Sequence, residues 1–219
     1  MPAKRYELIV FDWDGTLMDS AGAIVRAIQA ACEDLGLPVP EDARARHVIG
    51  LGLSDALSYA VPELTEDKYP DMVARYRHHY LSRDQELVLF DGIESTLKRL
   101  SDGGWWLAVA TGKSRVGLDR ALAHTGLGAH FHATRCADEC FSKPHPAMLE
   151  ELMAELSVPA ARTLMVGDTT HDLQMAQNAG VDGLAVTFGA HAPAMLALVP
   201  SVAHVATPAE LDRWLRDNA

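Results

Sequence analysis

The stretch LIVFDWDGTL, residues 8–17, decides the fold, and the rest of the chain is organised around it. Its first four residues are apolar and run directly into Asp12 and Asp14, with Gly15 following. A short, continuous apolar run that ends at a turn signal is typical of a strand buried on both faces. Residues i and i+2 of a strand point to the same side, about 6.5 Å apart. We therefore expect both carboxylates in one pocket at the carboxyl end of this strand.

The tetrapeptide at 12–15 has simpler interpretations when it is taken alone. It fits an Asx turn after a strand, or a fragment of a calcium-binding loop. The calcium loop needs further acidic ligands and a Glu about twelve residues on, whereas the following positions are apolar. The turn interpretation is set aside only because similar polar residues recur at the ends of other predicted strands.

Composition narrows the class of protein. The chain has 219 residues, of which 48% are hydrophobic, and a formal net charge of -11. This length fits one α/β domain or a domain with an insert. The negative charge argues against nucleic acid and anionic membranes as partners. The apolar run at 8–11 is too short for a signal peptide, and three cysteines cannot pair evenly. We therefore expect a cytoplasmic protein; its oligomeric state is not evident from the sequence.

Residues 18–83 carry only helical patterns. Apolar residues at helical spacing follow Ser20, a candidate N-cap, and this run stops before Gly36. Shorter helical patterns occupy 42–48 and 54–60, and a longer one occupies 70–81. The sequence therefore predicts a helical block inserted directly after the first strand.

From residue 84 onward, strand and helix patterns alternate. Buried strands are expected at 105–110, 163–166 and 183–188, with a shorter candidate at 130–135. Helical patterns separate these strands, and a capping box at 207–210 begins a C-terminal helix. Such alternation predicts an α/β fold, in which helices cover both faces of a parallel sheet.

Three of the predicted strands are followed by polar residues: Asp12 and Asp14, then Thr111 to Lys113, then Asp168 with Asp172. Ligands of open α/β sheets bind at the carboxyl ends of the strands, so these residues are expected to form one site. Several carboxylates in one place repel unless a cation neutralises them, and Mg²⁺ is the hard ion that suits such ligands. Taken alone, Asp168 and Asp172 would fit a helix N-cap and a surface acid equally well.

A phosphoryl group and its leaving oxygen would fit between carboxylates placed like those of Asp12 and Asp14. A site with several carboxylates and a phosphate also needs a fixed cation. Lys143 precedes Pro144, which stiffens the backbone, although a lone lysine is usually solvated surface. Lys113 follows Thr111, whose hydroxyl could hold a phosphate oxygen together with the N–H groups after it. Sequence reasoning does not separate the two lysines.

These motifs, in this order, resemble those of the haloacid dehalogenase superfamily: DWDGTL at 12–17, Thr111, Lys143 with its proline, and Asp168 with Asp172. The chain is most similar to phosphoglycolate-phosphatase-like members that carry a helical cap after the first motif. This resemblance covers nearly the whole chain. It implies a Rossmann-like parallel-sheet core, residues 1–17 and 84–219, with an inserted all-helical cap domain, residues 18–83.

The resemblance also implies roles for the motif residues. Asp12 would be the nucleophile that forms an aspartyl-phosphate, and Asp14 the acid that protonates the leaving group and later activates water. The phosphoryl group would be held by Thr111, Gly112 and Lys143. The Mg²⁺ ligands would be Asp12, the main-chain carbonyl of Asp14, Asp168 and, directly or through water, Asp172.

The implied function is a Mg²⁺-dependent phosphatase that hydrolyses a small phosphomonoester such as 2-phosphoglycolate. Dehalogenases lack an acid at the position of Asp14. Sugar phosphomutases of the β-phosphoglucomutase type carry a His early in the first cap helix and an Arg after the cap-loop glycine, whereas this chain has Ile24 and the run GLGL at 50–53. A mutase, and a non-catalytic binding protein with this fold, remain alternatives.

The cap loop at 47–52 is the candidate for contact with the substrate, through His47, Gly50, Leu51 and Gly52. The alternative is a glycine-rich connection between two helices. Few charged residues lie in this loop, which favours a small phosphorylated metabolite as the partner.

Overall fold

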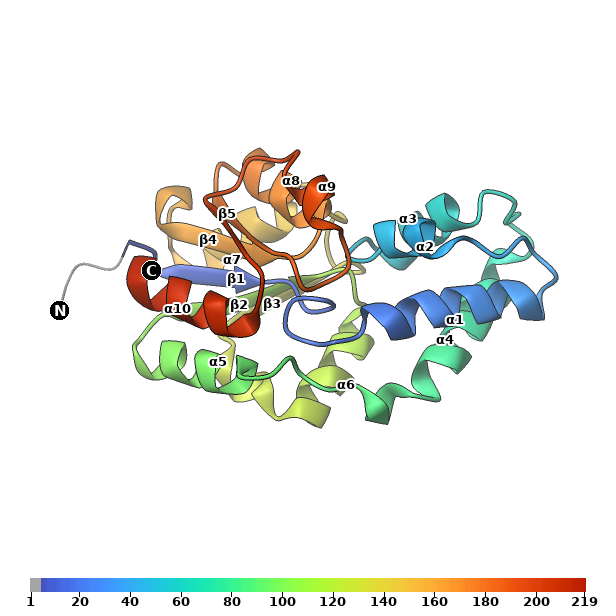
Figure 1. The fold of residues 1–219 in the computed structure, drawn as a ribbon, viewed down its shortest axis with the longest axis horizontal. Helices are drawn as coiled ribbons and strands as arrows, with labels where there is room; N and C mark the ends of the chain where they lie inside the picture. Colours follow the sequence, from blue (N-terminus) through green and yellow to red (C-terminus); the bar gives the residue numbers. More distant parts are fainter. Residues whose placement is uncertain (1–4) are drawn as a thin grey trace.

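A six-stranded parallel sheet in the order β3-β2-β1-β4-β5-β6 lies at the centre of the computed structural model, which describes residues 5–219 (Figure 1). Its strands are β1 (Leu8–Phe11), β2 (Trp106–Thr111), β3 (Ala133–Cys136), β4 (Thr163–Gly167), β5 (Asp182–Val186) and β6 (Ala203–Val205). Strand β1 pairs with both β2 and β4, so that Phe11 lies opposite Val109 and Val166. The predicted α/β fold with a central first strand is confirmed.

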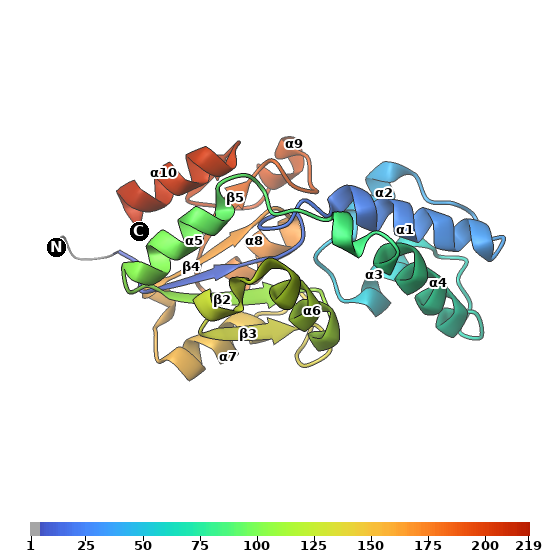
Figure 2. The same cartoon turned by 90° about the horizontal axis from the view of Figure 1, so that it is seen from below.

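Alternate residues of β1 face opposite sides of the sheet. Ile9 and Phe11 pack with α5 (Ile93–Asp102), α6 (Arg115–Thr125) and α10 (Pro208–Asn218). Leu8 and Val10 pack with α7 (Ala147–Leu156) and α8 (Thr170–Asn178) on the other side (Figure 2). Because both faces are covered, the strand needs an apolar residue at every position, which explains its continuous apolar run.

Four helices lie beyond the carboxyl ends of the strands (Figures 1 and 2). They are α1 (Ala21–Asp34), α2 (Asp42–His47), α3 (Leu53–Ala60) and α4 (Tyr69–Leu81). These helices pack around an apolar cluster of their own, which includes Ile28, Leu57 and Met72. We call α1–α4 the cap helices; the domain boundaries given above stay a prediction.

Two short elements were not predicted from the sequence, and one predicted strand begins later than expected. Strand β6 and helix α9 (Pro193–Leu196) have three and four residues, too few to show a period. The expected strand at 130–135 begins later, at Ala133, because residues 127–130 form a 3₁₀ helix. Segments this short show no clear alternation of buried and exposed residues. Their boundaries therefore cannot be predicted from a hydrophobic pattern alone.

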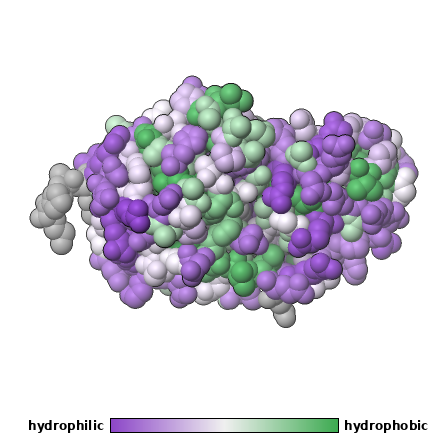
Figure 3. Space-filling model, viewed as in Figure 1, coloured by the Kyte–Doolittle hydropathy of each residue, from purple (hydrophilic) through white to green (hydrophobic). Residues whose placement is uncertain are grey.

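The surface is mixed in polarity. Figure 3 shows apolar areas over α6 and over α9 on a face that is otherwise largely polar. Val116 of α6 and Leu198, which follows α9, are among the exposed hydrophobic residues, at 68% and 82%. Across residues 5–219, every helix is too short or too polar to cross a membrane.

Candidate active site

Lys143 lies in a buried cluster of charged side chains. Its Nζ donates to Asp12 Oδ1 at 2.7 Å and to Asp172 Oδ1 at 2.6 Å. Lys143 is 2% exposed, and Asp12, Asp168 and Asp172 are 0% exposed. Asp12 follows β1, Asp168 follows β4, and Lys143 precedes α7. The structure thus brings Asp12 together, at one edge of the sheet, with Lys143, which lies 131 positions later in the chain.

Asp168 and Asp172 are held by groups that surround the cluster. Asp168 accepts from the Thr16 hydroxyl at 2.8 Å and from the Ala190 N–H at 2.7 Å. Asp172 Oδ2 accepts from the Thr169 N–H at 3.0 Å, and the two residues form a capping box at the start of α8. Asp172 therefore caps helix α8 and also pairs with Lys143. Sequence reasoning missed all three partners, although Thr169-x-x-Asp172 has the spacing of a capping box.

Glycines make room for the two carboxylates. Gly15 has a φ of +86°, and a Cβ there would overlap the carboxylate of Asp168. A Cβ at Gly189 would overlap Asp168 from another side, and one at Gly167 would overlap Asp172. The close approach of the backbone to these carboxylates at three positions thus requires residues without side chains.

The carboxylates of Asp12, Asp168 and Asp172 could hold a metal ion. One oxygen from each lies within 4.8 Å of the others. Asp12 Oδ2 is buried and has no hydrogen-bond partner among the described residues, although a buried carboxylate oxygen normally has one. An all-oxygen donor set suits a hard divalent cation. The cluster therefore fits such an ion.

The charges of the cluster are not balanced by Lys143 alone. Burial raises the pKa of Asp12 well above its ordinary value; Lys143 opposes this, while Asp172 and Asp168 add to it. Burial, followed by the charge of Asp172, raises the pKa of Asp168 to about 7. Burial alone would lower the pKa of Lys143, but the carboxylates of Asp12 and Asp172 raise it. One permanent ammonium thus faces three carboxylates, which favours the binding of a further cation.

Asp14 has partners of its own. Its Oδ1 accepts from the Ser20 hydroxyl at 2.6 Å and from Lys113 Nζ at 3.0 Å. Lys113 also donates to the Tyr80 hydroxyl at 3.0 Å. Ser20 is the N-cap of α1, but its hydroxyl bonds Asp14 and makes no cap bond. The two lysines are therefore separated: Lys143 lies in the buried cluster, and Lys113 lies beside Asp14.

The end of β2 meets the cap loop. Thr111 is fully buried, and its Oγ1 accepts the Lys113 N–H at 3.2 Å. A Cβ at Gly112 would overlap the carbonyl oxygens of Leu51 and Gly50. Gly50, Leu51 and Gly52, together with Asp14, Gly112 and Lys113, line a cavity between the cap helices and the core. The cap loop therefore lies at the site.

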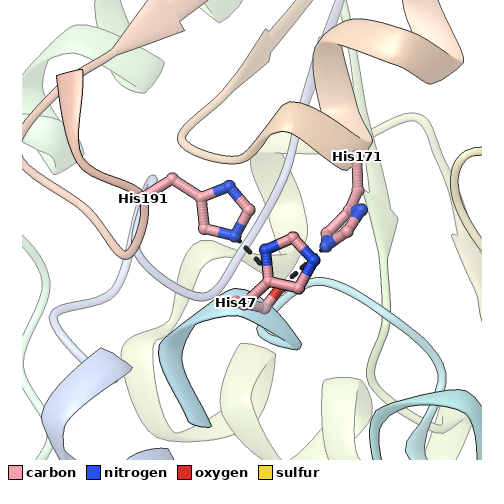
Figure 4. Close-up of side chains that lie close together, drawn as sticks. All are labelled: His47, His171 and His191. Carbon is pink, nitrogen blue, oxygen red and sulfur yellow. Dashed lines mark hydrogen bonds between the residues drawn. The ribbon is translucent and has the colours of Figure 1, made fainter. Parts of the chain in front are cut away.

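Figure 4 shows the rings of His47, His171 and His191 gathered where α2 meets the core. The carbonyl oxygen of His47 lies 2.7 Å from Nε2 of His171 and 3.0 Å from Nε2 of His191. Nδ1 of His191 accepts the Thr170 N–H at 3.0 Å, which leaves Nε2 to carry the proton and donate to that carbonyl. His47 thus ties α2 to the core through its main chain, and it is not among the residues that line the cavity.

The three histidines also satisfy the spacing of a metal site, with ring nitrogens within 4.8 Å of one another. However, Nε2 of both core histidines already contacts one carbonyl oxygen (Figure 4). Burial lowers the pKa of His191 to about 4, so its ring is neutral near pH 7 and keeps this hydrogen-bond pattern. The cluster accordingly acts as a contact between cap and core.

Comparison with known proteins agrees with this architecture. Residues 9–186 match the sequence profile of the haloacid dehalogenase-like hydrolases. The chain belongs to this family and is a hydrolase of the haloacid dehalogenase type, so the resemblance inferred from the motifs is confirmed.

Three relatives illustrate the range of the family. The chain is 37% identical over 190 residues to the probable phosphatase IndB of Dickeya dadantii, covering 84% of this chain and 82% of IndB. It is 35% identical over 191 residues to the tyrosine-protein kinase PtkA of Mycobacterium tuberculosis, covering 86% of this chain and 64% of PtkA. A predicted phosphoglycolate phosphatase from Haemophilus somnus superposes with a TM-score of 0.84 at 25% identity, covering 96% of this chain and 98% of that structure.

The contact at Gly112 can be tested by substitution. We expect Gly112→Ala to displace the cap loop, because the new methyl group meets main-chain oxygens that cannot rotate away. Stability should fall by about 1–3 kcal/mol, and amide hydrogen exchange in residues 47–53 should accelerate. Gly117→Ala on α6 is the control, since a Cβ there meets its nearest atom, Ser114 Oγ, at 3.3 Å. Unchanged exchange in Gly112→Ala would contradict the contact.

The raised pKa of Asp168 predicts how stability depends on pH without metal. Between the ordinary value of 3.8 and about 7, the folded state holds a proton that the unfolded state has lost. The stability of wild-type protein in EDTA should therefore fall as pH rises through this window. Asp168→Asn removes the penalty and should be more stable than wild type at pH 8 by about 1–3 kcal/mol, with the difference shrinking toward pH 4.

Urea unfolding at several pH values would measure this difference, with Asp102→Asn, an exposed acid, as the control. A wild type that gains stability over Asp168→Asn as pH rises would contradict the assignment.

Proposed function

We propose that this hydrolase is a Mg²⁺-dependent phosphatase that cleaves a phosphomonoester through an aspartyl-phosphate on Asp12. The observation that supports this most directly is the state of the Asp12 carboxylate. Its Oδ1 is bound by Lys143 at 2.7 Å, while its buried Oδ2 has no partner among the described residues. One oxygen is thus held in place and the other is free to attack phosphorus.

In the first step, Asp12 Oδ2 forms a bond to phosphorus as the bond from phosphorus to the ester oxygen breaks. The protonated carboxyl group of Asp14 gives its proton to the departing alkoxide. The products of this step are an alcohol, an aspartyl-phosphate on Asp12 and the carboxylate of Asp14. Asp14 lies two residues after Asp12, and its carboxylate is fixed by Ser20 and Lys113. It is positioned independently of the buried cluster, as a proton donor to the leaving group requires.

In the second step, water attacks phosphorus and gives its proton to the Asp14 carboxylate. Phosphate leaves, and the carboxylate of Asp12 is restored. Lys143 stays paired with Asp12 and Asp172 and offers positive charge to the phosphoryl oxygens. The Thr111 hydroxyl accepts from a main-chain N–H, so its own proton remains available to a phosphoryl oxygen.

Asp12, Asp168 and Asp172 would hold Mg²⁺, with the main-chain carbonyl of Asp14 as a further ligand. When bound, the ion neutralises the charge that otherwise opposes attack of a carboxylate on a phosphate anion. The all-oxygen donor set of the three carboxylates supports this choice.

The names of two relatives agree with the proposal. IndB is called a probable phosphatase, and the Haemophilus structure is called a predicted phosphoglycolate phosphatase. Cap residues likewise favour hydrolysis over the reaction of a mutase. Ile24 and the loop residues Leu51 and Leu53 line the cavity and supply no ring nitrogen or guanidinium there.

The proposal is tested by hydrolysis of p-nitrophenyl phosphate. Asp12→Asn should lower kcat by at least about a thousandfold, because the nucleophile is lost. Lys143→Met should lower kcat by about a hundredfold or more, because the charge beside the phosphoryl group is lost. Asp102→Asn and Lys98→Met, which remove an exposed ion pair on α5, are the matched controls. Full activity in Asp12→Asn would overturn the mechanism.

The metal requirement is tested separately. Wild-type activity should disappear in EDTA and return with Mg²⁺. Mg²⁺ should also stabilise the folded wild type, by about 1.4 kcal/mol at ten times the dissociation constant, and should stabilise Asp168→Asn much less. Equal activity with and without EDTA would contradict the metal site. Conversion of a sugar 1-phosphate into its 6-phosphate would instead support the mutase alternative.

A further inference from the structure

The cavity beside Asp14 is large for the substrate that the sequence suggested. It has a volume of about 680 Å³ and lies between the cap helices and the turn after β2. Proteins hold drug-sized ligands in cavities of about 300–1,000 Å³. In the proposed mechanism the buried cluster and Thr111 bind the phosphoryl group. The cavity is therefore available to the alcohol part of the ester.

The cavity wall next to Asp14 is aromatic. Tyr76 and Tyr80 of α4 line it, and their rings stack with 5.9 Å between centroids and 23° between planes. Tyr80 receives a hydrogen bond from Lys113, the same ammonium that contacts Asp14. Lys113 thus links the tyrosine pair to Asp14, the residue that faces the leaving group.

Aliphatic side chains continue this wall. Ile24 and Ile28 of α1 line the cavity and are 9% and 2% exposed, and Val73 lines it from α4. Burial raises the pKa of Tyr76, so its hydroxyl stays neutral. The wall formed by α1 and α4 therefore offers rings and methyl groups.

The positive charges of the cavity are poorly placed for a carboxylate on the substrate. Three lining residues are cationic: Arg77, Lys113 and Arg120. Lys113 is bound to Asp14, and both arginines are exposed. A glycolate carboxylate beside Asp14 would have to share Lys113 with Asp14, and burying a carboxylate without a cation of its own is unfavourable.

We propose, on the basis of the phosphatase function above, that the substrate is a phosphomonoester whose alcohol carries an aromatic ring, bound against Tyr76 and Tyr80. The ring stacks on the tyrosine pair and packs on the aliphatic residues of α1, with the ester oxygen toward Asp14. Offset aromatic stacking of this kind adds to the burial of apolar area. Selection for such an alcohol thus comes from α1 and α4 of the cap.

The test compares benzyl phosphate with 2-phosphoglycolate. Both release a primary alcohol, so the comparison reports recognition of the alcohol more than the reactivity of the leaving group. We expect kcat/KM of the wild type in Mg²⁺ to be at least about tenfold higher for benzyl phosphate. A wild-type preference for 2-phosphoglycolate, or equal values, would overturn this inference without any variant being needed.

Variants then locate the recognition. Tyr76→Leu should reduce the benzyl-to-glycolate ratio of kcat/KM about fivefold, mainly through KM for benzyl phosphate, and Tyr76→Phe should restore the ratio. Tyr59→Leu, a half-exposed tyrosine of α3 outside the cavity, is the matched control and should keep the wild-type ratio. A ratio that Tyr76→Leu leaves unchanged would overturn the assignment to the tyrosine pair.

The two proposals fail in different ways. If 2-phosphoglycolate is the better substrate and Asp12→Asn is inactive, the phosphatase mechanism stands and the aromatic substrate is wrong. If Asp12→Asn hydrolyses both esters as the wild type does, the mechanism is wrong, and the substrate inference that rests on it falls as well.

Discussion

The ion pairs of Lys143 with Asp12 and Asp172 are the constraint on which the site depends. A buried charge is tolerated only when it is paired and hydrogen-bonded, and removing one member leaves the others uncompensated. Here one ammonium holds carboxylates that follow two different strands. The same bonds fix Asp12 so that only one of its oxygens is engaged. Structure and reactivity therefore depend on the same contacts.

The sheet makes this pairing possible. Since β1 lies between β2 and β4, the loops that follow these three strands emerge side by side. The N–H of Asp12 donates to the carbonyl of Val166 at 2.9 Å, which continues the register of the strands into the site. Glycines at 15, 167 and 189 then let the loops approach the carboxylates closely. Backbone geometry accordingly sets the positions of the charges.

Two lysines divide the site into regions with different chemistry. Lys143 lies in a fully buried cluster that fits a phosphoryl group and a cation. Lys113 lies at the cavity, where it joins Asp14 to Tyr80 of the cap. In the proposed mechanism, the leaving group and the transferred group thus meet different parts of the protein. In this proposal the core supplies the chemistry of phosphoryl transfer, and the cap supplies recognition of the alcohol.

Local patterns in the sequence were sufficient for the parallel sheet, the helical insert and the acidic motifs, because strand and helix periods and strand-end residues are properties of neighbouring positions. They could not separate Lys143 from Lys113, since both are lysines near a turn. They also did not reveal Ser20 or Tyr80 as partners of Asp14 and Lys113, or His47 as a contact between cap and core. Those assignments depend on which distant segments meet, and only the packing of α1–α4 against the strand ends decides that.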